Sequence, residues 1–183
     1  MKNSKSLLAA LVLATASFGA PTAFAADIST PPQALSLVGT SAFFGDSFAM
    51  NNNGDTFMDH FTFNVTGTKP TSLDAIVSSI SRTASTGLDI TGLSLYTSGG
   101  SLLTSGVMSS SGARDIWTLS ADSLAAGSYY LQVSGSLVSN TSGSFGGSIM
   151  LNAVPEPETY GMMLAGLGVV GLLARRRKVT KQA

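Results

Sequence analysis

Residues 56–66 read TFMDHFTFNVT, and apolar and polar side chains alternate along them. A period of two is that of a half-buried β-strand, because every second side chain of a strand lies on the same face. Phe57, Asp59, Phe61, Phe63 and Val65 therefore share one face. The stretch predicts a strand whose buried aromatic row contains an aspartate.

The remainder of the central region repeats this pattern. Short alternating apolar runs recur roughly every eight to twelve residues, separated by Gly-rich, Ser-rich and Asn-rich turns such as Asn53-Gly54. We expect Gly146-Gly147 to form a bulge or kink within a strand. The spacing predicts an all-β fold, an antiparallel β-sandwich, with strands at 33–38, 42–50, 56–66, 72–81, 88–97, 101–105, 113–119, 127–134 and 144–153.

Two segments indicate which type of β-sandwich to expect. Residues 93–96 read LSLY and are followed by Gly99-Gly100, and residues 124–133 read LAAGSYYLQV. Together they resemble the closing half of the pre-peptidase C-terminal type of β-sandwich. The resemblance implies a fold of this type, or a jelly roll, and implies no activity.

The amino-terminal segment has the composition of a signal peptide. Lys2 and Lys5 precede an apolar run at 7–14, and Ala23 and Ala25 are small residues at the positions that signal peptidase requires. We predict a signal peptide over residues 1–25, removed by signal peptidase. The exported domain then spans residues 26–154.

The carboxy-terminal segment has the composition of a membrane anchor. Residues 154–159 read VPEPET, residues 160–174 carry no charge, and four cations follow: Arg175, Arg176, Arg177 and Lys178. As a transmembrane helix, 160–174 is about 22 Å long and crosses a hydrocarbon core of about 30 Å only marginally. The basic stop is expected in the cytoplasm, with the tail in the inner membrane and the domain outside.

This order of elements resembles the PEP-CTERM sorting signal of Gram-negative bacteria, in a tail region also known as the ice-binding protein C-terminal domain. Pro155, Glu156 and Pro157 match its motif, and the prolines favour an extended strip at residues 155–157. The resemblance implies that an exosortase, an integral-membrane cysteine protease, removes residues 155–183. It implies delivery to the cell surface or an exopolysaccharide matrix. The alternative is a permanent single-pass anchor.

Charge and cysteine content limit the partners of the domain. The chain has no net charge, but residues 26–154 carry eight aspartates against Lys69, Arg82 and Arg114, which gives −5. An acidic domain without a basic patch is not expected to bind nucleic acid. The chain has no cysteine, so its stability depends on packing without disulfides.

The pattern F-x-D-x-F occurs twice, on either side of residues 51–55, which read NNNGD. Together with the tail, the two copies resemble the FxDxF family of PEP-CTERM proteins, whose members are exported and otherwise without an assigned function. The motif residues are Phe44, Asp46, Phe48, Phe57, Asp59 and Phe61.

We expect the two copies to form a hairpin. A two-residue turn at Asn53-Gly54 places Asp46 opposite Phe61 and leaves the two acids diagonal, about 7 Å apart, whereas a four-residue loop places Asp46 opposite Asp59. Three interpretations are open. The acids accept bonds from backbone amides or pair with Arg82 or Arg114, they bind Ca²⁺ with help from Asp55 or an Asn carbonyl, or they form a glycosidase carboxylate pair. We expect the first, with no cofactor.

Little other chemistry is present. His60 is the only histidine and lies on the face opposite Asp59, and Trp117 is expected in the core rather than as a sugar platform. We therefore predict a non-enzymatic exported protein of the surface or extracellular matrix. The alternatives are a carbohydrate-binding module that adheres to exopolysaccharide and a permanently anchored periplasmic domain.

Overall fold

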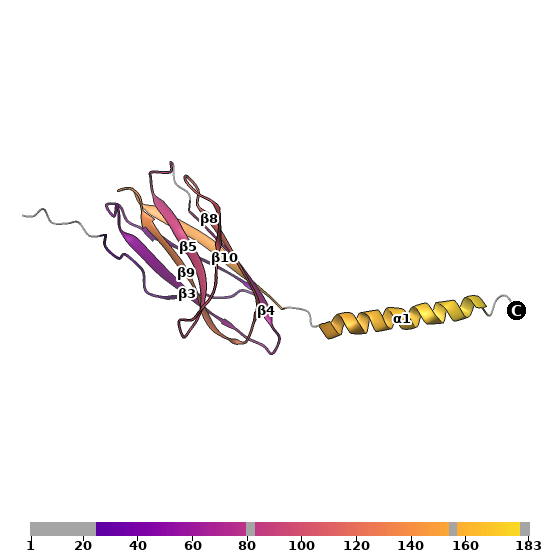
Figure 1. The fold of residues 1–183 in the computed structure, drawn as a ribbon. Coiled ribbons are helices and arrows are strands. Elements are labelled where there is room, and N and C mark those ends of the chain that lie inside the picture. The colour runs from indigo at the N-terminus through magenta and orange to yellow at the C-terminus, as the bar shows by residue number, and fades with distance from the viewer. Residues whose placement is uncertain (1–24, 80–82, 154–156, 180–183) are drawn as a thin grey trace, which may run out of the picture.

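The computed structural model describes residues 25–79, 83–153 and 157–179. Two β-sheets pack face to face there, and one helix lies outside them (Figure 1). The strands are β1 (Gln33–Ala34), β2 (Ser41–Phe48), β3 (Thr56–Val65), β4 (Thr71–Ser79), β5 (Leu88–Thr97), β6 (Leu102–Ser105), β7 (Val107–Ser110), β8 (Ile116–Leu124), β9 (Gly127–Leu137) and β10 (Gly143–Ala153), and the helix is α1 (Pro157–Val179).

Each sheet has five strands. One has the order β1-β3-β9-β5-β6 and the other β2-β10-β4-β8-β7. Neighbouring strands are antiparallel except β1 and β3, which are parallel. The predicted antiparallel β-sandwich is confirmed.

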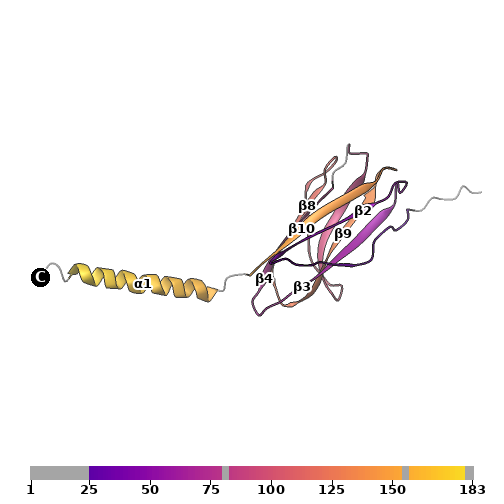
Figure 2. The same cartoon turned by 180° about the vertical axis from the view of Figure 1, so that it is seen from behind.

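The predicted hairpin between the two F-x-D-x-F strands is wrong. β2 pairs with β10 and β3 pairs with β9, so the two motif strands belong to opposite sheets (Figure 2). Neither predicted register exists, and the connection crosses between sheets using Asn51 at φ 71° and Gly54 at φ 90°. Each of the two strands carries a row of apolar side chains on one face. Because the strands lie in opposite sheets, the two rows pack against each other in the interior of the sandwich.

Aromatic rings from the two motifs meet in the core. Phe44 lies 4.9 Å from Phe61 and Phe48 lies 4.6 Å from Phe57, measured between ring centroids. Phe145 of β10 stacks on Phe57 of β3 at 5.5 Å, so a third ring joins the two sheets. The paired F-x-D-x-F motifs are thus a packing device that joins the two sheets.

The predicted bulge at Gly146-Gly147 is also wrong, because β10 pairs with both neighbours without a register shift. Gly147 lies opposite Phe44, and a Cβ at Gly147 would come within 2.5 Å of the Phe44 ring. Gly135 has the same relation to Phe57 across β9 and β3, also at 2.5 Å. These glycines leave room for the rings, which explains their place within strands.

Several strand boundaries differ from the predicted ones. β1 has two residues rather than six, β9 continues to Leu137, and β8 spans Ile116–Leu124 instead of 113–119. β8 starts late because Asp115 turns inward, where its carboxylate accepts bonds from the amides of Gly112 and Ile90. β7 was not predicted, since its apolar side chains Val107 and Met108 are adjacent and exposed rather than alternating.

The tail forms a helix, as expected, but a longer one than 160–174. α1 begins at Pro157, a favoured first helical residue because its missing N–H needs no partner there. The predicted extended strip is therefore wrong for Pro157, while Pro155 and Glu156 lie outside the described residues. Among the described residues, no helix is long and apolar enough to cross a membrane. The Arg175 side chain of the predicted basic stop is exposed.

The predicted signal peptide lies outside the described residues except for Ala25, and so does Ala23 of the predicted cleavage site. The described chain begins with exposed Ala25 and Ala26. Arg82, a predicted partner for the acids, is also outside the described ranges.

Candidate functional site

Residues 26–35, here called the strap, run along the open edge of β3. The Thr56 amide donates to the Ala26 carbonyl at 2.9 Å, and the Leu35 amide donates to the Thr62 carbonyl at 2.8 Å. Between these points the Met58 amide donates to the hydroxyl of Ser29, a strap residue, at 2.7 Å. The strap thus covers a strand edge that would otherwise be free to pair with another chain.

Asp59 is buried beneath the strap with 1 % of its surface exposed. Its Oδ1 accepts a hydrogen bond from the Thr30 amide at 2.8 Å. Its Oδ2 is buried and has no hydrogen-bond partner among the described residues. Burial raises the pKa of Asp59, the bond from the Thr30 amide opposes this, and the nearby charge of Asp46 raises the pKa further.

Asp46 reaches the same place from the opposite sheet. Its Oδ2 accepts a hydrogen bond from the Thr30 hydroxyl at 2.7 Å, and its Oδ1 accepts from the Ser47 amide at 2.6 Å. The Thr30 hydroxyl also lies 3.3 Å from Asp59 Oδ1. Thr30 therefore joins the two motif acids, and these three residues are called the acid bridge below.

The acid bridge favours the structural interpretation of the acids. Asp59 accepts a backbone amide, as expected for a cap, although that amide comes from the strap and not from a bulge. Asp55, the third acid considered for Ca²⁺, is engaged elsewhere, by the Ala26 amide at 2.8 Å. Among the described residues no three His, Cys, Asp or Glu side chains are grouped to hold a metal ion, and two carboxylates fall short of the six to eight oxygens that Ca²⁺ takes.

The acid bridge also lacks the access that sugar hydrolysis requires. A glycosidase pair flanks a bound sugar, so both carboxyl groups must reach the substrate. Asp59 is closed to solvent by the strap, and Thr30 occupies the position between the acids. The arrangement fastens the strap to both sheets through Thr30.

Thr30 is the residue that sequence reasoning missed. It stands in STPP at 29–32, without the alternation that marks a strand. The one available signal was an aspartate within a buried aromatic row, which requires a donor from some other segment.

His60 lies on the outer face of its sheet, as predicted. Its Nε2 is 3.1 Å from Gln132 Oε1, and its ring packs on Tyr130 at 4.7 Å. Tyr130 in turn stacks on Tyr96 at 5.0 Å with 7° between the rings. The rings pack on one another across three strands, so this row stabilises neighbouring strands.

The prediction of a core tryptophan is confirmed only in part, since Trp117 lies at the border of the core rather than within it. Trp117 is partly buried and packs against the hydrophobic core. Its Nε1 donates to the Ile90 carbonyl at 3.0 Å, which satisfies its polar group. The ring is thus fixed by packing and by this bond, as expected for a structural residue.

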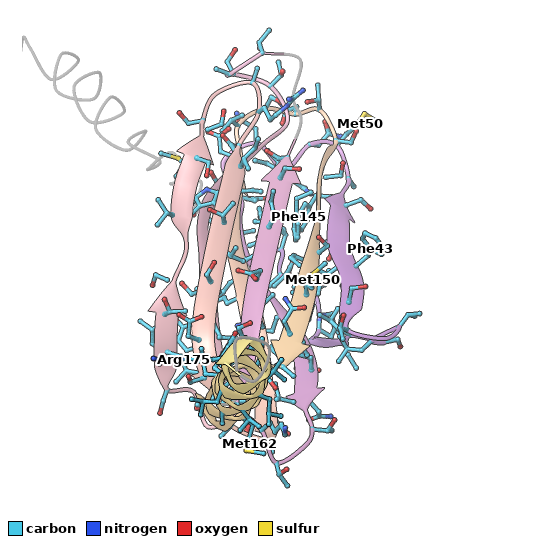
Figure 3. The ribbon with its side chains drawn as sticks, turned by 90° about the vertical axis from the view of Figure 1, so that its right-hand side faces the viewer. Phe43, Met50, Phe145, Met150, Met162 and Arg175 are labelled. Carbon is cyan, nitrogen blue, oxygen red and sulfur yellow. The ribbon has the colours of Figure 1, made fainter. Side chains whose placement is uncertain are left out.

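A shallow groove of about 490 Å³ crosses the outer face of the β2-β10-β4-β8 region. Phe43, Ile76 and Met150 supply apolar surface, and Thr118, Ser120 and Ser148 supply hydroxyl groups. Phe43 is 86 % exposed and points away from the sandwich at β2 in Figure 3. Its neighbour in the pattern, Phe44, points inward, so the alternation of β2 produces both the core and this groove.

Comparison with known families addresses the tail. A family model described as the PEP-CTERM protein-sorting motif matches residues 153–178. The tail is a PEP-CTERM sorting motif. Such a motif marks a protein that an exosortase sorts to the cell surface, and here the match begins at Ala153, the last residue of β10.

Comparison with known proteins adds little on the domain. No curated protein matches the chain. Among solved structures, the pre-peptidase C-terminal domain of a collagenase from Bacillus anthracis is similar at 16% sequence identity, with a TM-score of 0.36. That match covers 67% of this chain and 95% of the collagenase domain.

Proposed function

We propose that residues 26–154 are a non-enzymatic structural protein of the cell surface or extracellular matrix, and that the PEP-CTERM motif delivers them there. The observation that carries the proposal is the position of the motif, which starts at the last residue of the last strand. All residues of the hydrophobic core precede the motif, so removal of residues 155–183 leaves the core intact.

The proposed route has two processing steps. Signal peptidase removes residues 1–25 during export, and residues 155–183 hold the precursor at the inner membrane until an exosortase removes them. The alternative, a permanently anchored periplasmic domain, differs only in the second step.

Deleting residues 155–183 tests this function, since it leaves the sandwich whole. We expect the truncated protein to miss the cell surface and to collect in the periplasm, and we expect an unrelated exported domain fused to residues 153–183 to reach the surface. Equal surface delivery with and without the tail would contradict the proposal.

The groove on β2 supports a second candidate function, binding to exopolysaccharide. An exposed aromatic ring beside hydroxyl groups suits the apolar and polar faces of a sugar ring, and Phe43 with Thr118 and Ser148 has this composition. Phe43→Ser should weaken retention on polysaccharide from the producing cells at least tenfold. Met58→Ser, which changes a residue 50 % exposed on the other sheet, is the matched control. Equal retention of both variants would exclude this groove as the polysaccharide-binding site.

A further inference from the structure

Asp55 holds the first residue of the strap. Its Oδ1 accepts a hydrogen bond from the Ala26 backbone nitrogen at 2.8 Å. The backbone of Asp55 is itself fixed, because its amide donates to the Asn52 carbonyl and its carbonyl accepts from the Leu137 amide, both at 3.0 Å. The carboxylate is thus held in place at the end of the strap.

Ala26 is also the residue that leader removal would leave first, after the sequence Ala23-Phe24-Ala25. Hydrolysis of the bond between Ala25 and Ala26 adds one water: the C–N bond breaks, the Ala25 carbonyl carbon gains a hydroxyl group and the Ala26 nitrogen gains a hydrogen. At neutral pH the products ionise to a carboxylate and an α-ammonium group.

We propose that Asp55 is the counter-ion of the mature amino terminus, with the α-ammonium group of Ala26 taking the place of the amide that now donates to Asp55 Oδ1. This inference rests on the proposed export of residues 26–154. Cleavage converts a hydrogen bond between a neutral amide and a carboxylate into an ion pair, and such charge-assisted bonds are stronger.

The surrounding groups favour this pairing. Asp27 is the other acid at this end of the strap, and its Oδ1 accepts from the amide of Ser29, so it turns back into the strap. The Ala26 carbonyl remains bonded to the Thr56 amide, which fixes the position of its nitrogen. An ammonium group at that nitrogen has three hydrogens, one of which meets Asp55 while the others reach solvent at this exposed residue.

The pairing has a consequence for the acid bridge. The strap has a free end only after cleavage, and a free end frays unless it is tied down. Asp55 ties it four residues before Thr30, the donor to both motif acids. The stronger bond at Ala26 therefore keeps the strap fastened over Asp59 after the leader is removed.

The test uses the full chain exported from a bacterium and purified in its mature form. The mass of the N-terminal peptide identifies the first residue, and an NMR titration of isotopically labelled protein follows the Ala26 resonances to give the pKa of the α-amino group. We expect Ala26 as first residue and a pKa at least about half a unit above the usual range of about 7.7–8.0. Asp55→Asn should return the pKa to that range, and Asp122→Asn, at an exposed acid on β8, should leave it raised.

A mature chain that starts at another residue would overturn the proposal, and so would an ordinary pKa in the unmodified protein or a raised pKa that persists in Asp55→Asn. If Asp55→Asn fails to fold, the N-terminal mass and the titration of the unmodified protein still test the first two of these outcomes. Release of the tail, measured on the same samples, reports separately on the proposed sorting function.

Discussion

Phe44 and Gly147 lie directly opposite each other in the β2/β10 pair, and the ring of Phe44 occupies the space where a Cβ of Gly147 would stand. From that position the ring reaches Phe61 of the other sheet at 4.9 Å. The first phenylalanine of each F-x-D-x-F motif has such a glycine, since Phe57 lies opposite Gly135. The motif therefore works together with a small residue on a strand far away in the sequence.

Gly147→Ala should destabilise the sandwich by about 1–3 kcal/mol, because the new methyl group collides with the Phe44 ring and with the backbone oxygen of Ile76. Urea unfolding of the mature protein measures this. Gly146→Ala is the control: it is exposed, and its Cβ would meet nothing closer than the Phe44 carbonyl oxygen at 3.9 Å. We expect that variant within about 0.5 kcal/mol of the parent. Equal effects of the two substitutions would contradict the proposed packing.

Thr30→Val should cost about 1 kcal/mol, because it keeps the shape of the side chain and removes the hydroxyl that donates to Asp46. The backbone amide of residue 30 still donates to Asp59 in this variant. Thr91→Val, at an exposed position of β5, is the matched control and should be neutral or slightly stabilising. A Thr30→Val protein as stable as the control would show that the bond from the Thr30 hydroxyl to Asp46 contributes nothing.

The free energy of unfolding should fall as pH rises above the ordinary aspartate pKa of 3.8. Burial raises the pKa of both Asp59 and Asp89, so the folded state keeps protons that the unfolded state has already lost. The loss of unfolding free energy is complete once the pH exceeds the raised pKa values of Asp59 and Asp89. Urea unfolding from pH 4 to 7 measures the slope, and Asp59→Asn should flatten it.

Asp27→Asn is the control with the opposite sign. The Ser29 hydroxyl and amide lower the pKa of Asp27, so its contribution is present above the unfolded pKa and is lost as pH falls. In Asp27→Asn, the free energy of unfolding should therefore fall with rising pH at least as steeply as in the parent. A slope identical in the parent and in Asp59→Asn would refute the role given to burial of Asp59.

The sequence predicted which side chains face inward and failed to predict which strands are neighbours. Phe57 to Val65 have the predicted face because the period of two is a local property. The partner of β2 is set by contacts between distant segments, Phe44 with Gly147 and with Phe61, which no local pattern contains. For the same reason both acids of the candidate site were found from the motif, while Thr30, which joins them, was not.

Pro155→Ala combined with Pro157→Ala should trap a precursor whose tail stays at the membrane. Both residues belong to the matched motif, and Pro157 also begins α1, where alanine is an acceptable replacement. The substitution thus changes recognition while leaving the helix able to form. Cell fractionation followed by immunoblotting measures the retained precursor, and release at the parental rate would count against exosortase recognition.

The intact mass of the protein recovered from the cell surface or matrix shows whether both ends of the chain are processed as proposed. We expect a chain that begins at Ala26 and lacks the apolar segment 160–174, because both ends have been processed. A mass that still includes the residues through Ala183 would contradict it and would identify the domain as permanently anchored.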